Sequence, residues 1–414
     1  MFTFFIELLD LIFLKQLGVF FTFFLATWVF FLIKRYNSLK YLKEIEALKM
    51  VGNYRPAVSV ILPIVDEPIE VWEKVLESLK VALQGLKHEV IVVFNGKNGE
   101  VNKRLARNYG YNVYSLPTPN KREAIAFGVE KAKHDITIML DSDTICTPTA
   151  ITELISMFQF DTIGGIVPRQ EVFNRDDNLL RKFCDWLEHL RFLNGLPGTA
   201  NHGAVPCLIG RLYAIRTSIL KDCMPEFLNE TFLGYKCVIG DDRFITSCIL
   251  KRGYHTVYQP RSLVYTDAPN TIKQFMKQRT RWARSSFRET IMAIPWIFKH
   301  KYTAFVLFGD IFMLWFLFFV LARFLFGLVA GFDNQHYIST IYPELNNVLF
   351  FAIGSMLGFI VSSFTKQMHY FKVKPKDFWY APLFMLFLTF CLVPTQWIGH
   401  LTCWKNGWMT RKVD

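Results

Sequence analysis

The chain has 414 residues and a formal net charge of +12, with 52% hydrophobic and 20% charged residues. A soluble enzyme rarely carries so much apolar sequence, and a bundle of membrane helices alone would carry fewer charges. The basic residues form no tract interleaved with base-stacking aromatic residues, which argues against nucleic-acid binding. Both ends are rich in Phe and Leu, and charges concentrate between about residues 35 and 301. We therefore expect a soluble domain joined to membrane helices.

The eight cysteines form no Cys-x-x-Cys pair and no zinc-like spacing with histidine. They are expected to be buried, reduced thiols of a cytosolic domain.

The first expected element is an uncharged apolar segment over residues 17–33, closed by Lys34 and Arg35. It is long enough to cross a hydrocarbon core, which needs about 17–25 residues. The basic closure predicts that its C-terminal end lies in the cytoplasm. The preceding stretch, Phe2–Leu14, contains two acidic residues and lacks the basic start of a signal peptide. It is predicted either to lie in the membrane interface or to form a second, poorer span.

Short apolar, β-branched runs then alternate with amphipathic stretches. They predict strands at residues 58–65, 89–94, 111–116 and 135–140. Helices are predicted between them at residues 70–83, 101–109 and 121–132. This alternation predicts an α/β fold with a Rossmann-like parallel sheet covered on both faces. Ligands of such sheets bind beyond the carboxyl ends of the strands, so polar residues that follow each strand are candidate site residues.

An Asp-x-Asp pair follows the fourth strand, at Asp141 and Asp143. Carboxylates two residues apart on a strand point the same way, because side chains alternate with period two. Such a pair can hold a hard divalent cation whose other positions take diphosphate oxygens. Asp-x-Asp often occurs by chance in solvated loops, but its position after the fourth strand favours a ligand site.

Further polar residues lie at the same predicted edge: Asp66 and Glu67 after the first strand, and Asn95 after the second. They are suited to hydrogen-bonding a nucleobase and a ribose, although Asp66 and Glu67 could equally cap the next helix. Lys121 begins a predicted helix at this edge and could contact a diphosphate. The alternative for Lys121 is a solvated helix end.

An acidic pair, Asp241 and Asp242, lies between apolar flanks and is followed by Arg243. Charged residues in apolar surroundings cost free energy unless they have partners or a purpose. One of these carboxylates could act as a general base on a substrate hydroxyl.

A Gln-x-x-Arg-Trp sequence follows, in which Gln278, Arg281 and Trp282 fall within about one helical turn. Arginine suits diphosphate oxygens, and a flat indole suits stacking on a sugar ring. The alternative is a basic amphipathic helix on the membrane interface. We expect such a helix for residues 282–301, but it does not explain the Gln-x-x-Arg-Trp order.

The C-terminal part contains three apolar stretches, at residues 302–332, 347–364 and 378–404. If all three crossed the membrane, the basic tail would lie outside, against the positive-inside tendency. The last stretch is therefore predicted to be bent or re-entrant at Pro382 and Pro394, returning the tail to the cytoplasm. The expected organisation is a membrane segment, a cytoplasmic domain, an interface helix and a C-terminal membrane region, over residues 1–36, 37–281, 282–301 and 302–414.

In this order the motifs resemble those of the processive family 2 glycosyltransferases, which include cellulose, chitin, hyaluronan and type 3 capsular polysaccharide synthases. The resemblance runs from about Val58 to Arg411. Segments similar to type 3 capsular synthases are Val65–Pro68, Cys207–Arg211, Asp241–Arg243 and Tyr265–Pro269. Segments similar to hyaluronan synthases are Gly240–Arg243, Phe287–Glu289 and Trp408–Arg411. Two departures weaken a hyaluronan assignment: Asp66 replaces a usual asparagine, and Gly210-Arg211 replaces Ser-Gly-Pro.

The resemblance implies a GT-A domain with interface and transmembrane helices. It implies that Glu67 and Asn95 lie near the uridine of a UDP-sugar and Lys121 near its phosphates, with Asp66 also among the residues that bind the nucleotide. It implies that Asp141 contacts the nucleotide and, with Asp143, binds Mg²⁺ or Mn²⁺. Asp242, beside Asp241, is then the general base. Diphosphate and acceptor sugar are then held by Gln278, Arg281 and Trp282.

The implied activity is metal-dependent, inverting polymerisation of UDP-sugars into a β-linked extracellular polysaccharide, coupled to its translocation. Its implied partners are the growing polysaccharide and membrane lipids. Glucose or GlcNAc alternating with glucuronic acid is the expected composition, as in capsules. A first alternative is a non-processive transferase acting on a polyprenyl phosphate or another lipid, which does not need Gln-x-x-Arg-Trp. A second is a transporter or nucleotide sensor with a decayed catalytic domain.

Overall fold

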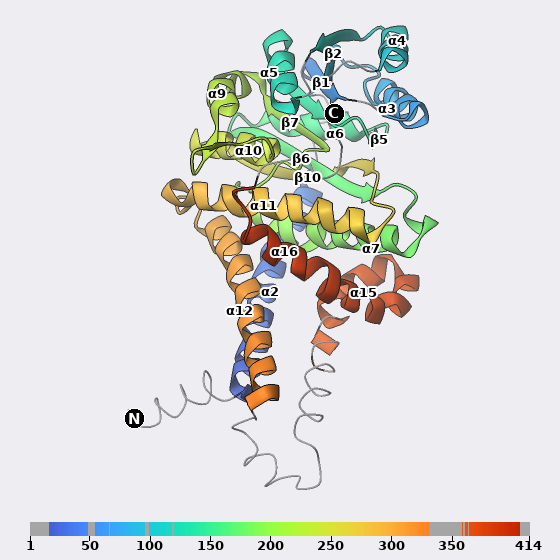
Figure 1. The fold of residues 1–414 in the computed structure, drawn as a ribbon. Helices are drawn as coiled ribbons and strands as arrows, with labels where there is room; N and C mark the ends of the chain where they lie inside the picture. Colours follow the sequence, from blue (N-terminus) through green and yellow to red (C-terminus); the bar gives the residue numbers. More distant parts are fainter. Residues whose placement is uncertain are drawn as a thin grey trace. The chain divides into compact units, whose positions relative to one another are not determined.

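The computed structural model describes residues 16–48, 54–65, 67–95, 99–117, 120–330, 358, 361–362 and 364–405. The chain divides into two compact units. Unit 1 comprises Met1–Tyr36 and Ala304–Pro394, and unit 2 comprises Asn37–Thr303 and Thr395–Asp414. Unit 2 contains the β-sheet, whereas the described part of unit 1 is helical (Figure 1).

Among the described residues of unit 2, the strands include the four that the sequence predicts and six more. They are β1 (Val58–Ile64), β2 (His88–Asn95), β3 (Asn112–Leu116), β4 (Ile136–Leu140), β5 (Thr144–Cys146), β6 (Ile163–Val172), β7 (Leu212–Arg216), β8 (Thr231–Phe232), β9 (Tyr235–Lys236) and β10 (His255–Thr266).

The three predicted helices between the first strands are also present. The helices are α3 (Ile69–Ala82), α4 (Glu100–Asn108), α5 (Lys121–Lys131), α6 (Ala150–Ser156), α7 (Leu179–Leu190), α8 (Leu196–Ala200), α9 (Thr217–Asn229), α10 (Asp241–Lys251) and α11 (Ile272–Ile297). The predicted interface helix over 282–301 overlaps the second half of α11, which is one continuous helix through the Gln-x-x-Arg-Trp sequence.

The large sheet has the strand order β3-β2-β1-β4-β7-β6-β10-β5. The four predicted strands pair in parallel, as expected. The predicted parallel sheet is therefore only part of a mixed sheet, because β7 is antiparallel to both β4 and β6, and β5 is antiparallel to β10. Strand β7 follows a long connection rather than a short crossover helix, so local alternation carries no signal of its direction.

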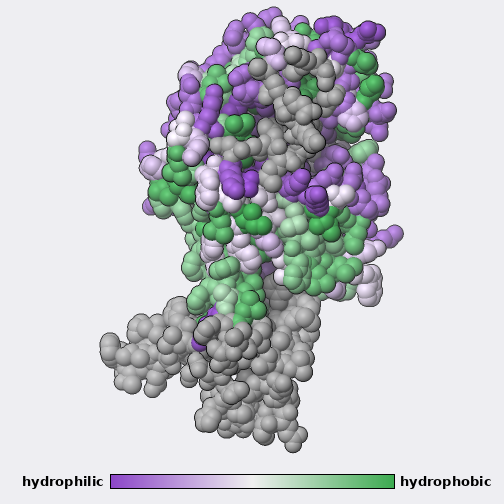
Figure 2. Space-filling view, viewed as in Figure 1, coloured by the Kyte–Doolittle hydropathy of each residue, from purple (hydrophilic) through white to green (hydrophobic). Residues whose placement is uncertain are grey.

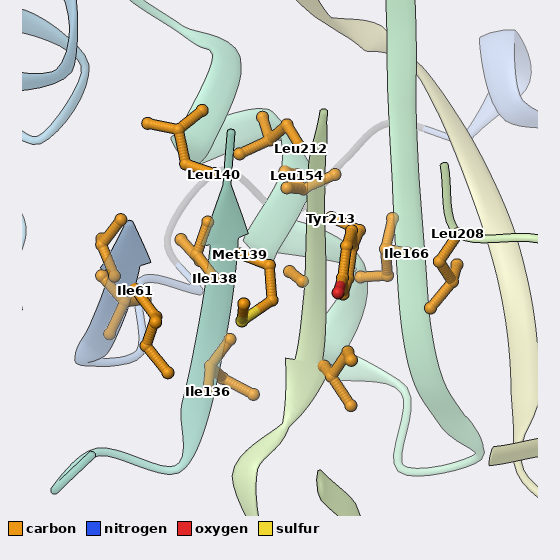
Figure 3. Close-up of a cluster of buried hydrophobic side chains, with 14 of the residues drawn as sticks. Ile61, Ile136, Ile138, Met139, Leu140, Leu154, Ile166, Leu208, Leu212 and Tyr213 are labelled. Atoms are coloured by element: carbon orange, nitrogen blue, oxygen red, sulfur yellow. The ribbon is translucent and has the colours of Figure 1, made fainter. Parts of the chain in front are cut away.

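The sheet is covered on both faces by helices, which agrees with the burial of β1 along its whole length. Figure 3 shows part of this core, where Ile61, Ile138, Ile166 and Tyr213 come from four different strands. Helix α5 approaches β1 closely at Gly128. A Cβ atom added at Gly128 would lie 2.5 Å from Cγ2 of Ile61, so only glycine fits. Close packing here fixes the start of α5, which carries Lys121.

Helix α2 (Gln16–Ala47) contains the predicted span 17–33, and α12 (Lys301–Ala330) contains most of the stretch 302–332. Within unit 1 these helices contact each other, since Lys34 Nζ lies 2.9 Å from Asp310 Oδ1 and Gly309 lies against the Phe30 ring. Figure 2 shows hydrophobic residues gathered over α12, where Phe305, Phe312 and Phe318 are exposed.

By length and composition, the segments Lys301–Arg323 and Pro375–His400 could each cross a membrane. The second comprises a 3₁₀ turn, α15 (Ala381–Phe387), a π turn and α16 (Val393–His400). Pro382 lies in the first turn of α15 and Pro394 near the start of α16, so the described backbone stays helical. The bent or re-entrant path remains a prediction. The stretch Phe2–Leu14, most of 347–364 and the segment Trp408–Arg411 lie outside the described residues.

Candidate active site

Three segments of unit 2 bring Lys121 together with two carboxylates. Its Nζ lies 2.9 Å from Asp141 Oδ1, at the end of β4, and 3.2 Å from Asp241 Oδ2, at the start of α10. Helix α5 begins at Lys121 because the Asn120 side chain caps it, accepting from the Arg122 N–H. Burial lowers the pKa of Lys121, but the two carboxylates raise it above its usual value, so the ammonium stays charged.

Asn95 and Glu67 support this arrangement from β2 and β1. The Asn95 side chain is buried, and its Oδ1 accepts from the Asn120 N–H at 2.8 Å, which holds the start of α5. Glu67 Oε1 accepts from Ser142 Oγ at 2.7 Å, which ties the β1 rim to the Asp-x-Asp turn. The N-cap of α3 is Pro68, so Glu67 does not cap that helix. Asp66 lies outside the described residues.

Asp242 is the second residue of α10, a helix that begins directly after Gly240, whose φ of 92° favours glycine. Its Oδ2 accepts from the Gly210 N–H at 3.1 Å and from Cys207 Sγ at 3.3 Å. Negative charge is favourable at a helix N-terminus, so both aspartates suit this turn.

The two neighbouring aspartates have opposite pKa shifts. Burial and the charge of Asp241 raise the pKa of Asp242 above its usual value. Burial also raises the pKa of Asp241, but the positive charges of Lys121 and Arg122 outweigh this effect, so the pKa of Asp241 lies below its usual value. Asp241 is therefore held as a charged partner of Lys121, whereas Asp242 is the better proton acceptor.

Gly210 and Arg211 join these groups. The Asp141 N–H donates to the Arg211 carbonyl at 2.9 Å, and the Gly210 N–H donates to Asp242. A Cβ atom at Gly210 would lie 3.7 Å from both Asp141 Oδ2 and Asp242 Oδ2, so these two oxygens face the same small space. An adjoining pocket is lined by Pro63, Lys121, Ile125, Met139, Leu140, Asp141, Gly210, Tyr213 and Asp241.

The Asp-x-Asp pair lies in the turn between β4 and β5 rather than on a strand. Strand alternation ends at Leu140, so it does not set the direction of Asp143, contrary to the sequence argument. No group of three or more His, Cys, Asp or Glu residues suited to a metal ion occurs in the described part of the chain. A cation held by Asp141 and Asp143 would need further ligands such as diphosphate oxygens, and Asp141 Oδ1 is paired with Lys121 in this structure.

Helix α11 brings the Gln-x-x-Arg-Trp residues to this region. Figure 1 shows α10 and α11 side by side, and a Cβ atom at Gly240 would lie 3.1 Å from Ser285 Cβ. Trp282 is half-buried, with the Arg279 guanidinium 4.7 Å and the Arg211 guanidinium 5.6 Å from its ring centroid. Arg211 therefore links Trp282 to the carboxylates. Gln278 and Arg281, also half-buried, lie on the same helix one turn before Trp282 and directly beside it.

Two residues in this region carry no motif that sequence reasoning could use. Glu188, at the end of α7, is buried and forms ion pairs with three arginines. Tyr213, on β7, is buried, and its hydroxyl finds no hydrogen-bond partner among the described residues. Glu188 gave no usable sequence signal, because the buried residues of α7 also include Arg181, Asp185 and His189.

The mixed sheet and its helices define the class of fold, an α/β fold of the GT-A type. The chain is similar to the solved structure of the mannosyltransferase PcManGT from Pyrobaculum calidifontis in complex with GDP-Man and Mn²⁺. The TM-score is 0.64, and the match covers 94% of this chain and 98% of that one at 17% sequence identity, which establishes likeness of fold.

Residues 56–285 match the family described as Glycosyltransferase like family 2. The chain is 30% identical over 302 residues to a hyaluronan synthase of Streptococcus pyogenes, covering 72% of this chain and 67% of that enzyme. It is 30% identical over 248 residues to an N-acetylglucosaminyltransferase of Mesorhizobium japonicum, covering 58% of each chain. It is 28% identical over 295 residues to hyaluronan synthase 2 of Xenopus laevis, covering 70% of this chain and 50% of that one. The chain belongs to glycosyltransferase family 2 and is a hyaluronan synthase-like enzyme that uses a nucleotide-sugar donor.

Proposed function

We propose that this enzyme is a processive, membrane-integrated synthase that polymerises UDP-sugars into a β-linked extracellular polysaccharide. The product is of capsule type and contains glucose or GlcNAc together with glucuronic acid. The membrane helices pass the growing chain outward from a cytoplasmic catalytic domain over residues 37–281.

One observation carries the proposal: Gly210 and Arg211 lie next to Asp141, Asp242 and Trp282, which belong to three different motifs. Gly210 lies between the Asp141 and Asp242 carboxylates, and Arg211 lies over Trp282. A sugar stacked on the indole would therefore lie near a base whose pKa is raised, with the donor held by Lys121 and Asp141. This grouping supports transfer to a sugar acceptor more than transfer to a lipid phosphate, which needs no aromatic platform.

The chemistry proposed is a single displacement with inversion. Asp242 takes the proton of the acceptor hydroxyl. At the same time the oxygen of that hydroxyl forms a bond to the anomeric carbon of an α-linked UDP-sugar. The bond between that carbon and the diphosphate oxygen breaks, and UDP leaves with the electron pair. Lys121, Gln278 and Arg281 are proposed to hold the diphosphate, and Glu67 and Asn95 to lie near the uridine. Mg²⁺ or Mn²⁺, when held by Asp141 and Asp143, would neutralise charge on the leaving diphosphate.

Features of unit 1 support the membrane part of the proposal. The exposed side of α2 carries Phe21, Leu25 and Val29, and α12 carries exposed phenylalanines, which suits contact with lipid. Basic residues follow the apolar part of α2 at Lys34 and Arg35, as at a cytoplasmic boundary.

The test is to incubate the purified full-length enzyme in lipid nanodiscs with single and paired radiolabelled UDP-sugars and to size the products. Polymer from one pair of donors is expected. Products limited to disaccharides or lipid-linked monosaccharides would overturn the proposal and favour the non-processive alternative. Asp242→Asn should lower kcat by roughly 10²–10⁴-fold while UDP still binds, since general-base catalysis contributes about that factor.

A further inference from the structure

Glu188 lies at the centre of a buried cluster of arginines. Its side chain is 1% exposed at the end of α7. Its Oε2 lies 2.9 Å from Arg191, and its Oε1 lies 3.4 Å from Arg211 and 3.5 Å from Arg279. Burial raises the pKa of Glu188, but the three guanidinium groups lower it to about 2, so the carboxylate is charged throughout the physiological range.

Two of these arginines also contact Trp282. The guanidinium of Arg279 lies 4.7 Å from the ring centroid and that of Arg211 lies 5.6 Å from it. Both donate to the same oxygen of Glu188, while Arg211 additionally donates to Gln170 at 3.0 Å. One carboxylate oxygen therefore holds both cations that lie against the indole.

The charge balance makes this carboxylate necessary. Arg211 and Arg279 have side chains only 11% and 7% exposed, so water screens their mutual repulsion poorly. Without a negative charge between them, each would move toward solvent and away from the ring. The acidic residues Asp141 and Asp241 cannot substitute, because they are paired with Lys121.

We propose that Glu188 is a positioning residue for acceptor binding: it holds Arg211 and Arg279 against Trp282 and thereby fixes the orientation of the indole on which the acceptor sugar stacks. The inference rests on the proposed role of Trp282. It assigns to α7 a function in acceptor recognition, although Glu188 itself touches neither substrate.

The test compares Glu188→Gln, which keeps the shape but removes the charge, with the wild type in nanodiscs. The assay is transfer of one labelled sugar from UDP-sugar to an added oligosaccharide of the product type. For E188Q the KM for the oligosaccharide is expected to rise about tenfold or more, with the KM for UDP-sugar within about twofold. Polymer made from paired donors should also become shorter. Glu188→Asp, which keeps the charge with a shorter reach, should recover part of the oligosaccharide affinity.

Asp185→Asn is the matched control, because Asp185 is buried on the same helix and pairs with Arg175 at 3.3 Å. Arg175 is not one of the two arginines that contact Trp282. D185N should lower thermal stability without changing the ratio of the two KM values. If E188Q changes stability and both KM values in the same way as D185N, Glu188 is only structural and the proposal is overturned. If E188Q does not accumulate as folded protein, E188D carries the test: any rise in KM should be confined to the oligosaccharide, and an equal rise in both KM values overturns the proposal.

The wild type separates this inference from the function proposed above. If the wild type transfers single sugars but makes no polymer, the proposal of a processive synthase is overturned. The two KM values of E188Q can still be compared with those of the wild type. Polymer formation with an unchanged oligosaccharide KM in E188Q would remove the role of Glu188 alone.

Discussion

At the scale of single residues, the two neighbouring aspartates of the site differ in their partners and therefore in their pKa values. Asp241 and Asp242 are adjacent in sequence, yet Lys121 contacts only the first, while the second accepts from a backbone N–H and a thiol. Proximity of two carboxylates makes it costly for both to ionise, and the one without a cationic partner becomes the stronger base. The roles proposed for the pair follow from their partners rather than from their identity.

This difference predicts a shift in pH dependence. Asp242 acts as a base only when deprotonated, so kcat should fall as pH falls through its raised pKa. Asp241→Asn removes the neighbouring charge that raises the pKa of Asp242, so the acid limb of the kcat–pH profile should move to lower pH. The profile is measured at saturating UDP-sugar. An acid limb that stays in place, or moves to higher pH, would contradict the coupling.

A second prediction concerns Tyr213. A buried hydroxyl without a hydrogen bond is destabilising, and phenylalanine fills nearly the same volume. Tyr213→Phe should therefore raise the free energy of unfolding by about 1 kcal/mol. Thermal unfolding of the full-length protein without substrate tests this. A lower midpoint than the wild type would show that the hydroxyl is satisfied in the folded state.

At the scale of elements, the site depends on how closely helices approach the sheet. Helix α5 packs closely on β1 at Gly128, and Lys121 is the first residue of α5. Helix α11 packs through Ser285 on Gly240, directly before Asp241 and Asp242. Small residues at both contacts allow the close packing that brings together Lys121 of α5, Asp141 after β4 and Asp241 of α10.

Gly128→Ala should accordingly destabilise the fold. Its new Cβ would lie 2.5 Å from Ile61 Cγ2, and overpacking of this kind costs about 1–3 kcal/mol. The double variant with Ile61→Ala removes the clashing atom, so its loss of stability should be less than the sum of the two single losses. Thermal unfolding of the four proteins measures this coupling. Additive losses would mean that α5 does not press on Ile61.

At the scale of the whole molecule, unit 2 contains the sheet and its buried core, whereas the helices of unit 1 carry many exposed apolar side chains. Exposed side chains such as Phe312 and Phe319 would face water at considerable cost outside a bilayer.

The corresponding prediction is that the protein behaves as an integral membrane protein. After alkaline carbonate extraction of membranes from expressing cells, the full-length chain should stay in the pellet. Protease added to intact cells should leave unit 2 uncut, and the same protease should cut it after lysis. Release into the supernatant by carbonate would indicate peripheral association instead.

Much of the parallel half of the sheet could be predicted from local sequence. The runs that form β1, β2 and β4 are mostly apolar because both faces of the sheet are covered, and that pattern needs no knowledge of distant contacts. The same reasoning located Asp141 and Lys121 at one edge, where an ion pair now joins them.

Tertiary structure alone decided the rest. The antiparallel direction of β7, the contact of Arg211 with Trp282 and the pairing of Glu188 with Arg211 and Arg279 all join residues far apart in the chain. Charges and ring contacts leave no periodic trace in sequence, because they act through space between single side chains. Sequence by itself therefore determined the elements and the chemical groups of the site, and packing determined which of those groups meet.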